Sequence, residues 1–134
     1  MASRQVHTPL RILIVEDHPV ISRMLEVTLE SLGQRVVGVA ADAAGVRRHD
    51  VGPIDLAIVD VNLADGPTGL AIAAYLSKEG VAVVFHTTDP GRIPAGFPHA
   101  LGLLEKPFTL KGLCEVVQLA GSYRRRRGGA SGAA

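Results

Sequence analysis

Two apolar runs in this chain end in carboxylates, which can bind a metal ion or act as nucleophiles. The run Arg11–Val15 is followed by Glu16 and Asp17, and the run Leu56–Val59 is followed by Asp60. Neither run alternates polar and apolar residues, as expected of strands buried on both faces of a parallel sheet. For either run alone, a buried strand whose final acid caps a turn is a sufficient explanation. Together the two ends indicate a site, because ligands of open α/β sheets bind outside the carboxyl ends of the strands.

The three acids would repel one another, so they need a counter-charge. A hard divalent cation such as Mg²⁺ suits a few carboxylates and waters, and an acidic rim balanced by solvent and Lys106 is the alternative. Thr87 and Lys106 end two later predicted strands. A hydroxyl and an ammonium facing clustered acids would suit a phosphoryl group, whose negative oxygens they can hold. Each residue alone is usually just solvated, so only their joint placement is informative.

The elements that must position these residues follow from apolar spacing, glycines and prolines. Strands are predicted at residues 11–15, 35–40, 56–60, 81–86 and 101–104. Helices are predicted from Pro19 to Gly33, after the capping residue Asp42, from about Thr68 to Gly80, and from the capping residue Thr109 to about Ala120. The segment 87–100 contains three prolines and two glycines, which predicts a loop with at most one helical turn.

Strands that alternate with helices predict an α/β fold with a parallel sheet and right-handed crossovers. The expected form is a flavodoxin-like, doubly wound sheet of five strands in the order 2-1-3-4-5, with a degenerate fourth helix. This order places the first and third strands side by side. Glu16, Asp17 and Asp60 would then converge.

Length and composition favour one globular domain. The chain has 134 residues, of which 47% are hydrophobic. We expect a flexible lead at 1–9, a domain at 10–120 and a disordered basic tail at 121–134. The tail holds Arg124 to Arg127, which leaves 10 basic residues against 13 acidic ones elsewhere. A lone cysteine, Cys114, and the lack of a long apolar segment predict a soluble, cytoplasmic protein.

In their order along the chain, these residues resemble the receiver domain of bacterial two-component response regulators. The resemblance covers roughly Leu10 to Ala120. The matching motifs are the acidic pair Glu16-Asp17, Asp60 followed by Asn62 and Gly66, Thr87, and Lys106-Pro107-Phe108. The ordered set is specific, although each piece alone is common.

The resemblance implies a role for each site residue. Asp60 would be the phosphoacceptor, and Mg²⁺ would be bound by Asp17 directly, by Glu16 through water and by the backbone carbonyl of Asn62. Thr87 and the backbone N–H of Thr88 would hydrogen-bond to the phosphoryl group, and Lys106 would pair with it. The family also implies a cis peptide bond before Pro107.

Two positions depart from the usual family pattern. Leu103 stands where many receivers carry an aromatic residue that moves on activation, and the region of the fourth helix is interrupted by prolines. In both features the chain resembles a subgroup of stand-alone receivers, which also has a segment like Phe85-His86-Thr87.

The predicted function is therefore that of a single-domain response regulator. It would accept a phosphoryl group from a histidine kinase or histidine phosphotransfer protein and act as a phosphorylation-dependent interaction switch, relay or sink. It would catalyse only its own phosphorylation and dephosphorylation. We expect a monomer or weak dimer that acts on an unknown downstream protein. Membrane attachment is not expected, because no apolar run approaches the length of a membrane span. Sequence-specific DNA binding is not expected either, because no DNA-reading helix pair follows the last helix.

Two alternatives stay open. One is a phosphorylation-independent adaptor with this fold, which would have no reason to keep the complete set of site residues. The other is a small aspartyl-phosphate phosphohydrolase, which generally carries a second acid where this chain has Asn62.

Overall fold

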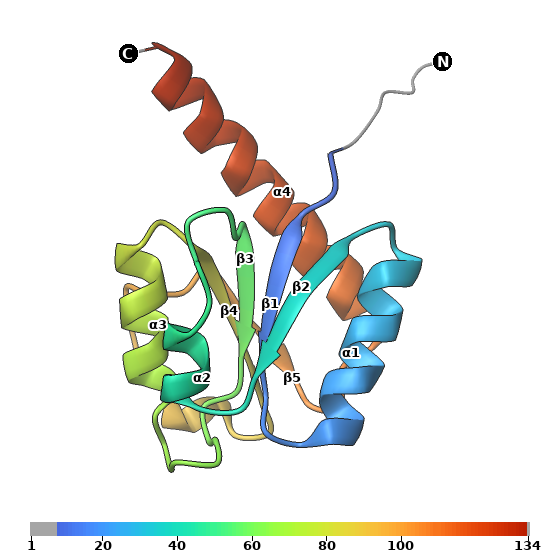
Figure 1. The fold of residues 1–134 in the computed structure, drawn as a ribbon, viewed down its shortest axis with the longest axis vertical. Helices are drawn as coiled ribbons and strands as arrows, with labels where there is room; N and C mark the ends of the chain where they lie inside the picture. Colours follow the sequence, from blue (N-terminus) through green and yellow to red (C-terminus); the bar gives the residue numbers. More distant parts are fainter. Residues whose placement is uncertain (1–7, 134) are drawn as a thin grey trace.

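The computed structural model describes residues 8–133, with side chains described as far as Arg127, and these residues form a parallel sheet between helices (Figure 1). The strands are β1 (Arg11–Val15), β2 (Arg35–Ala40), β3 (Leu56–Val59), β4 (Ala82–Thr87) and β5 (Gly102–Glu105). They pair in the order β2-β1-β3-β4-β5. The predicted flavodoxin-like architecture is confirmed. The last two strands lie one residue later than predicted, which places Thr87 inside β4.

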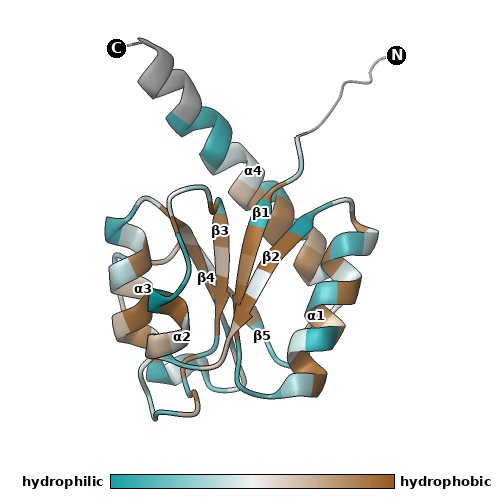
Figure 2. Cartoon of the chain, in the orientation of Figure 1, coloured by the Kyte–Doolittle hydropathy of each residue, from teal (hydrophilic) through white to brown (hydrophobic). Residues whose placement is uncertain are grey.

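Helices cover both faces of the sheet. α1 (Pro19–Ser31) and α4 (Leu110–Ala133) lie on one face, and α2 (Ala43–Arg47) and α3 (Gly69–Lys78) lie on the other (Figure 1). Each face has its own core: Leu25 and Leu113 contribute to one, and Val46 and Leu76 to the other. Figure 2 shows the apolar residues concentrated on the strands, while the helices carry both apolar and polar residues. The unbroken apolar runs of the sequence are therefore buried on both sides, as predicted.

The helix boundaries follow the predicted capping residues. The Asp42 carboxylate accepts a hydrogen bond from the N–H of Gly45 at 2.8 Å, and the Thr109 hydroxyl accepts one from the N–H of Gly112 at 2.9 Å. Gly80 follows α3 with a φ of 89°, a left-handed conformation that glycine adopts without steric cost.

The segment between β4 and β5 contains a single short 3₁₀ helix, η1 (Pro90–Arg92). This agrees with the prediction of at most one helical turn. Ile93, Phe97 and Ala100 pack against the core on the α2–α3 face and attach the rest of the segment to the domain.

Residues 121–133, which the sequence predicts to form a disordered basic tail, continue α4 as a helix in the structure. Arg124 ties its part of α4 to the start of the domain. Its guanidinium donates to the carboxylate of Asp55 at 3.1 Å and to the backbone carbonyls of Pro9 at 3.2 Å and Thr8 at 2.6 Å. Tyr123 also packs against the core on the α1–α4 face. These contacts bind Thr8 and Pro9, the last two residues of the predicted flexible lead. Residues 1–7 and 134 lie outside the described part of the chain.

None of the helices in the described residues is long and apolar enough to cross a membrane.

Candidate functional site

The pairing of β1 with β3 brings the three acids together. Val15 is in register with Val59, and the N–H of Asp60 donates to the carbonyl of Val15 at 2.9 Å. Glu16, Asp17 and Asp60 each place a carboxylate oxygen within 4.8 Å of the other two. The predicted convergence is confirmed.

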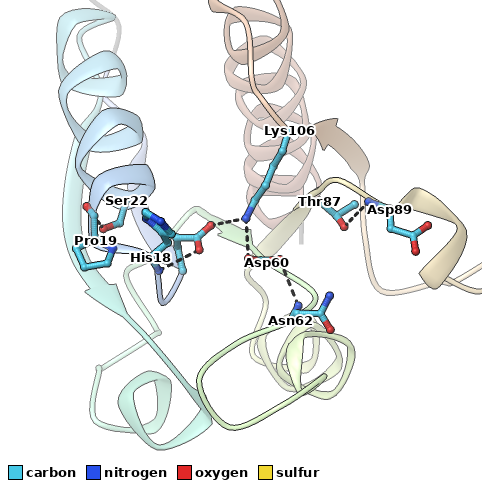
Figure 3. A network of polar contacts seen from close by, with 9 residues as sticks. His18, Pro19, Ser22, Asp60, Asn62, Thr87, Asp89 and Lys106 are labelled. Atoms are coloured by element: carbon cyan, nitrogen blue, oxygen red, sulfur yellow. Dashed lines mark hydrogen bonds and ion pairs between the residues drawn. The ribbon is translucent and has the colours of Figure 1, made fainter.

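Lys106 follows β5 and reaches the acidic cluster from the end of that strand. Its backbone N–H donates to the carbonyl of Thr87 at 2.9 Å, which fixes the chain as it leaves β5. Its Nζ lies 2.7 Å from Oδ2 of Asp60 and 2.9 Å from Oε1 of Glu16 (Figure 3). The peptide bond between Lys106 and Pro107 is cis, as the resemblance implied. One ammonium group therefore lies between two buried carboxylates.

The charges of this cluster perturb one another. Glu16 is 3% exposed and Asp60 7% exposed. Burial raises the pKa of Glu16, and the charge of Asp60 raises it further, while Lys106 opposes both effects. Burial alone would lower the pKa of Lys106, but the hydrogen bond to Asp60 and the contact with Glu16 outweigh it and raise that pKa. Three carboxylates facing one ammonium leave the site short of positive charge.

The cluster fits a hard divalent cation. Oε1 of Glu16 is buried and has no hydrogen-bond partner among the described residues, although Lys106 approaches it as an ion pair. A buried oxygen with an unused lone pair is costly unless something satisfies it. Carboxylate oxygens with open positions for water are the donors that Mg²⁺ prefers.

Two close contacts hold Asp60 in place. The backbone N–H of Asn62 donates to Oδ1 of Asp60 at 3.2 Å (Figure 3). Gly69, the first residue of α3, packs so tightly that an added Cβ would lie 2.2 Å from the carbonyl oxygen of Asp60 and 2.6 Å from Cα of Val61. Gly69 was not identified from the sequence, where its only signal is a glycine at a helix start.

Thr87 lies on the same sheet edge and is 2% exposed. Its hydroxyl oxygen accepts a hydrogen bond from the backbone N–H of Asp89 at 3.0 Å (Figure 3). Because a hydroxyl can accept and donate together, this contact leaves its proton for another acceptor. Thr88 follows directly and is exposed. The roles expected of its N–H and of the Asn62 carbonyl stay predictions.

His86 points to the other face of the sheet, as strand alternation predicts. Its ring lies 5.9 Å from that of Phe108 in an edge-to-face arrangement, and neither ring nitrogen has a partner among the described residues. Burial and the nearby charge of Lys106 lower the pKa of His86 to about 4. The imidazole is therefore neutral at pH 7.

The chain is similar to known proteins in sequence and in fold. The sequence model of the response regulator receiver domain matches residues 12–118. The phyllosphere-induced regulator PhyR of Methylorubrum extorquens is 37% identical over 114 residues, which cover 81% of this chain and 42% of that protein. This chain therefore spans less than half the length of that curated relative.

Two solved structures extend the comparison. SdrG from Sphingomonas melonis Fr1 is 35% identical with a TM-score of 0.70, and the match covers 84% of this chain and 96% of that one. The receiver domain of Erythrobacter litoralis PhyR is 31% identical with a TM-score of 0.75, covering 84% and 89% of the two chains. With a family model matched along most of its length, this chain belongs to the response regulator receiver domain family.

Proposed function

We propose that this protein is a response regulator of the single-domain type, which accepts a phosphoryl group on Asp60 from a phosphohistidine. The observation that carries this proposal is the position of Asp60, held between the ammonium of Lys106 at 2.7 Å and the acidic pair that follows β1. The coverage of 96% of the SdrG chain supports the single-domain reading.

The transfer is a displacement at phosphorus. A carboxylate oxygen of Asp60 attacks the phosphorus of the phosphohistidine, the P–N bond breaks, and its electron pair returns to the imidazole nitrogen. The product is an acyl phosphate on Asp60. Lys106 forms an ion pair with the negative oxygens of the phosphoryl group, and the Thr87 hydroxyl donates a hydrogen bond to one of them. The backbone N–H of Thr88 is the further donor that we assign to the phosphoryl group.

The residues that would hold Mg²⁺ are Asp17 directly, Glu16 through water, Asp60, and Asn62 through its carbonyl. When bound there, the ion would neutralise negative charge that otherwise repels the phosphodonor. The buried Oε1 of Glu16, which among the described residues is approached only by Lys106 as an ion pair, supports this assignment.

Loss of the phosphoryl group makes the signal temporary. A water oxygen attacks the phosphorus, the P–O bond to Asp60 breaks with its electron pair returning to the carboxylate, and inorganic phosphate leaves with release of a proton. The protein thus acts on its own acyl phosphate and not as a conventional enzyme. It would serve as an interaction switch, relay or sink.

An apolar stripe on α1 fits the phosphodonor protein. Val20, Met24 and Val27 follow one another at helical spacing and are 61%, 54% and 50% exposed. The stripe begins three residues after Asp17, beside the site. Exposed apolar stripes mark protein interaction surfaces, and one along a helix suits packing against the helices of a histidine kinase or histidine phosphotransfer protein.

Asp60 is tested by incubation with acetyl phosphate and Mg²⁺ followed by intact mass measurement. The parent and Asp65→Asn, a control in the same loop, should gain one phosphoryl group, and Asp60→Asn should gain none. Equal labelling of Asp60→Asn would refute the assignment. Labelling of no form would favour the adaptor, and sustained hydrolysis of an added phosphate ester would favour the phosphohydrolase.

Metal binding is tested by Mg²⁺ titration followed by calorimetry. Asp17→Asn should weaken binding more than Glu16→Gln, because Asp17 is assigned the direct contact. An unchanged affinity in Asp17→Asn contradicts this placement.

The α1 stripe is tested with Met24→Glu. This variant should lose phosphotransfer from a cognate histidine kinase, found by profiling the host's kinases, while labelling by acetyl phosphate is retained. Parental transfer rates in Met24→Glu would exclude the stripe as the docking surface.

A further inference from the structure

Arg92 connects the two loops that flank Asp60. Its Nη1 donates to the side-chain oxygen of Asn62 at 3.4 Å, in the loop between β3 and α3. Its Nε lies 3.5 Å from Oδ2 of Asp89, in the turn after β4. Arg92 therefore links segments that are 30 residues apart.

Both ends of this link lead back to the phosphorylation site. Asn62 donates its backbone N–H to Oδ1 of Asp60, and Asp89 donates its backbone N–H to the hydroxyl oxygen of Thr87. Four consecutive contacts thus run from Asp60 through Asn62, Arg92 and Asp89 to Thr87, the last residue of β4.

The fold itself does not depend on this link. The side chain of Arg92 is 53% exposed, and the segment after η1 is anchored to the core by Ile93 and Phe97. An ion pair at the surface contributes little to stability. The contribution of Arg92 is to restrain the rim of the site.

We propose that Arg92 is a positioning residue that prolongs the life of the acyl phosphate on Asp60, an inference that rests on the proposed function. By holding the Asn62 side chain and the turn after Thr87 together, it keeps both beside the phosphoryl group. This restraint narrows the approach of the water oxygen that must attack the phosphorus. Hydrolysis breaks the P–O bond to Asp60 and is therefore slower with Arg92 in place.

The test measures the half-life of the acyl phosphate after labelling with acetyl phosphate and removal of the donor. Arg92→Ala should shorten the half-life by about two- to tenfold, the range that corresponds to losing one hydrogen bond. Asn62→Ala, which keeps the backbone N–H, should shorten it similarly. The double variant should be no faster than the faster single variant, because both changes break the same link.

Two controls separate restraint from charge. Arg126→Ala removes an exposed arginine on the part of α4 that lies beyond the opposite end of the sheet and should leave the half-life unchanged (Figure 1). Arg92→Lys keeps the charge but cannot span both partners, so it should recover less than half of the lost lifetime. Thermal unfolding should show parental stability for each Arg92 variant.

Several outcomes would overturn the inference. A parental half-life in Arg92→Ala contradicts it, as do additive effects in the double variant or full recovery in Arg92→Lys, which would mean that charge alone acts. Failure of the parent to be labelled at all would instead remove the proposed function on which the inference rests.

Discussion

The ammonium of Lys106 lies 2.7 Å from Oδ2 of Asp60, and both side chains are largely buried. The same ammonium lies 2.9 Å from Glu16, so its charge compensates two carboxylates at once. Removal of one partner from a buried ion pair is costly, because the remaining charge stays buried without compensation.

Lys106→Met is expected to lower the free energy of unfolding by about 2–4 kcal/mol at pH 7, measured by urea denaturation. The loss should shrink as the pH falls below neutrality, because Glu16, whose pKa is already raised, takes up a proton more readily in the variant. Lys111→Met, at an exposed position in the first turn of α4, is the control and should change stability by less than about 0.5 kcal/mol. A loss of the same size at pH 7 and pH 5 contradicts this account.

His86 is expected to make the protein less stable in acid. Between pH 6.5 and about pH 4, the unfolded chain binds a proton on this residue that the folded protein does not, so stability falls as the pH falls. As the pH is lowered from 7 to 4.5, the free energy of unfolding of His86→Leu should rise relative to that of the parent by about 2 kcal/mol, allowing for partial solvent screening. Chemical denaturation at both pH values measures the difference, in which the opposite contribution of Glu16 cancels. Parallel pH profiles would show that His86 does not titrate in this range.

Gly69 and Gly121 are expected to respond in opposite directions to alanine. In Gly69→Ala the new methyl group would overlap the backbone of Asp60 and Val61, so stability should fall by about 1–3 kcal/mol and labelling of Asp60 should slow. In Gly121→Ala the methyl group meets only Arg125 at 3.6 Å inside α4, so stability should rise by about 0.5–1 kcal/mol. Thermal unfolding compares the two. A neutral Gly69→Ala would show that α3 can shift away from β3 without cost.

Arg124→Ala is expected to destabilise the protein by about 1–2 kcal/mol, because Asp55 and the carbonyls of Thr8 and Pro9 lose a shared donor. The labelling rate of Asp60 should be unchanged, since Arg124 lies at the opposite end of the sheet. Truncation after Tyr123 should have the same two effects. Slower labelling in either form would reveal communication between the two ends of the sheet.

The loop between β4 and β5 is expected to become more ordered when Asp60 carries a phosphoryl group or a phosphoryl mimic. Leu103 in β5 is 42% exposed and offers no ring to move, so the polar turn after Thr87 is the pliable element beside the site. Addition of beryllofluoride and Mg²⁺ should slow hydrogen exchange in residues 87–100. Thr87→Ala should remove most of this protection, and Thr87→Ser should keep it. Protection confined to the surroundings of Asp60, or intact in Thr87→Ala, would exclude the loop as the switch.

The sequence was sufficient to predict the fold and the convergence of the site. Apolar runs that end in Asp60 and Glu16 predicted parallel strands, and parallel strands necessarily bring their carboxyl ends to one edge. The contacts of Arg92 and Arg124 could not be predicted in this way. Each depends on a long side chain reaching a segment that only the folded chain brings near, and the pattern of charges along the sequence carries no such distance.

The order of residues 121–133 was missed for a related reason. Glycines around an arginine run suggested a solvated tail. Composition alone does not show that Arg124 binds the carboxylate of Asp55. The closeness of Gly69 to Asp60 was equally invisible, since a helix-starting glycine has the same sequence signal whether or not another segment approaches it.

The contact of Arg124 with Thr8 and Pro9 also brings the start of the described chain beside this part of α4, at the end of the sheet away from Asp60 (Figure 1). A short peptide linker from Arg124 to Thr8 would therefore not cross the edge of the sheet that carries Asp60. New ends opened at the exposed turn Gly52-Pro53 would leave β1, β3 and the residues that follow them intact. The domain is suited to circular permutation, and so to insertion within another protein, where under the proposed function it would respond to phosphorylation of Asp60.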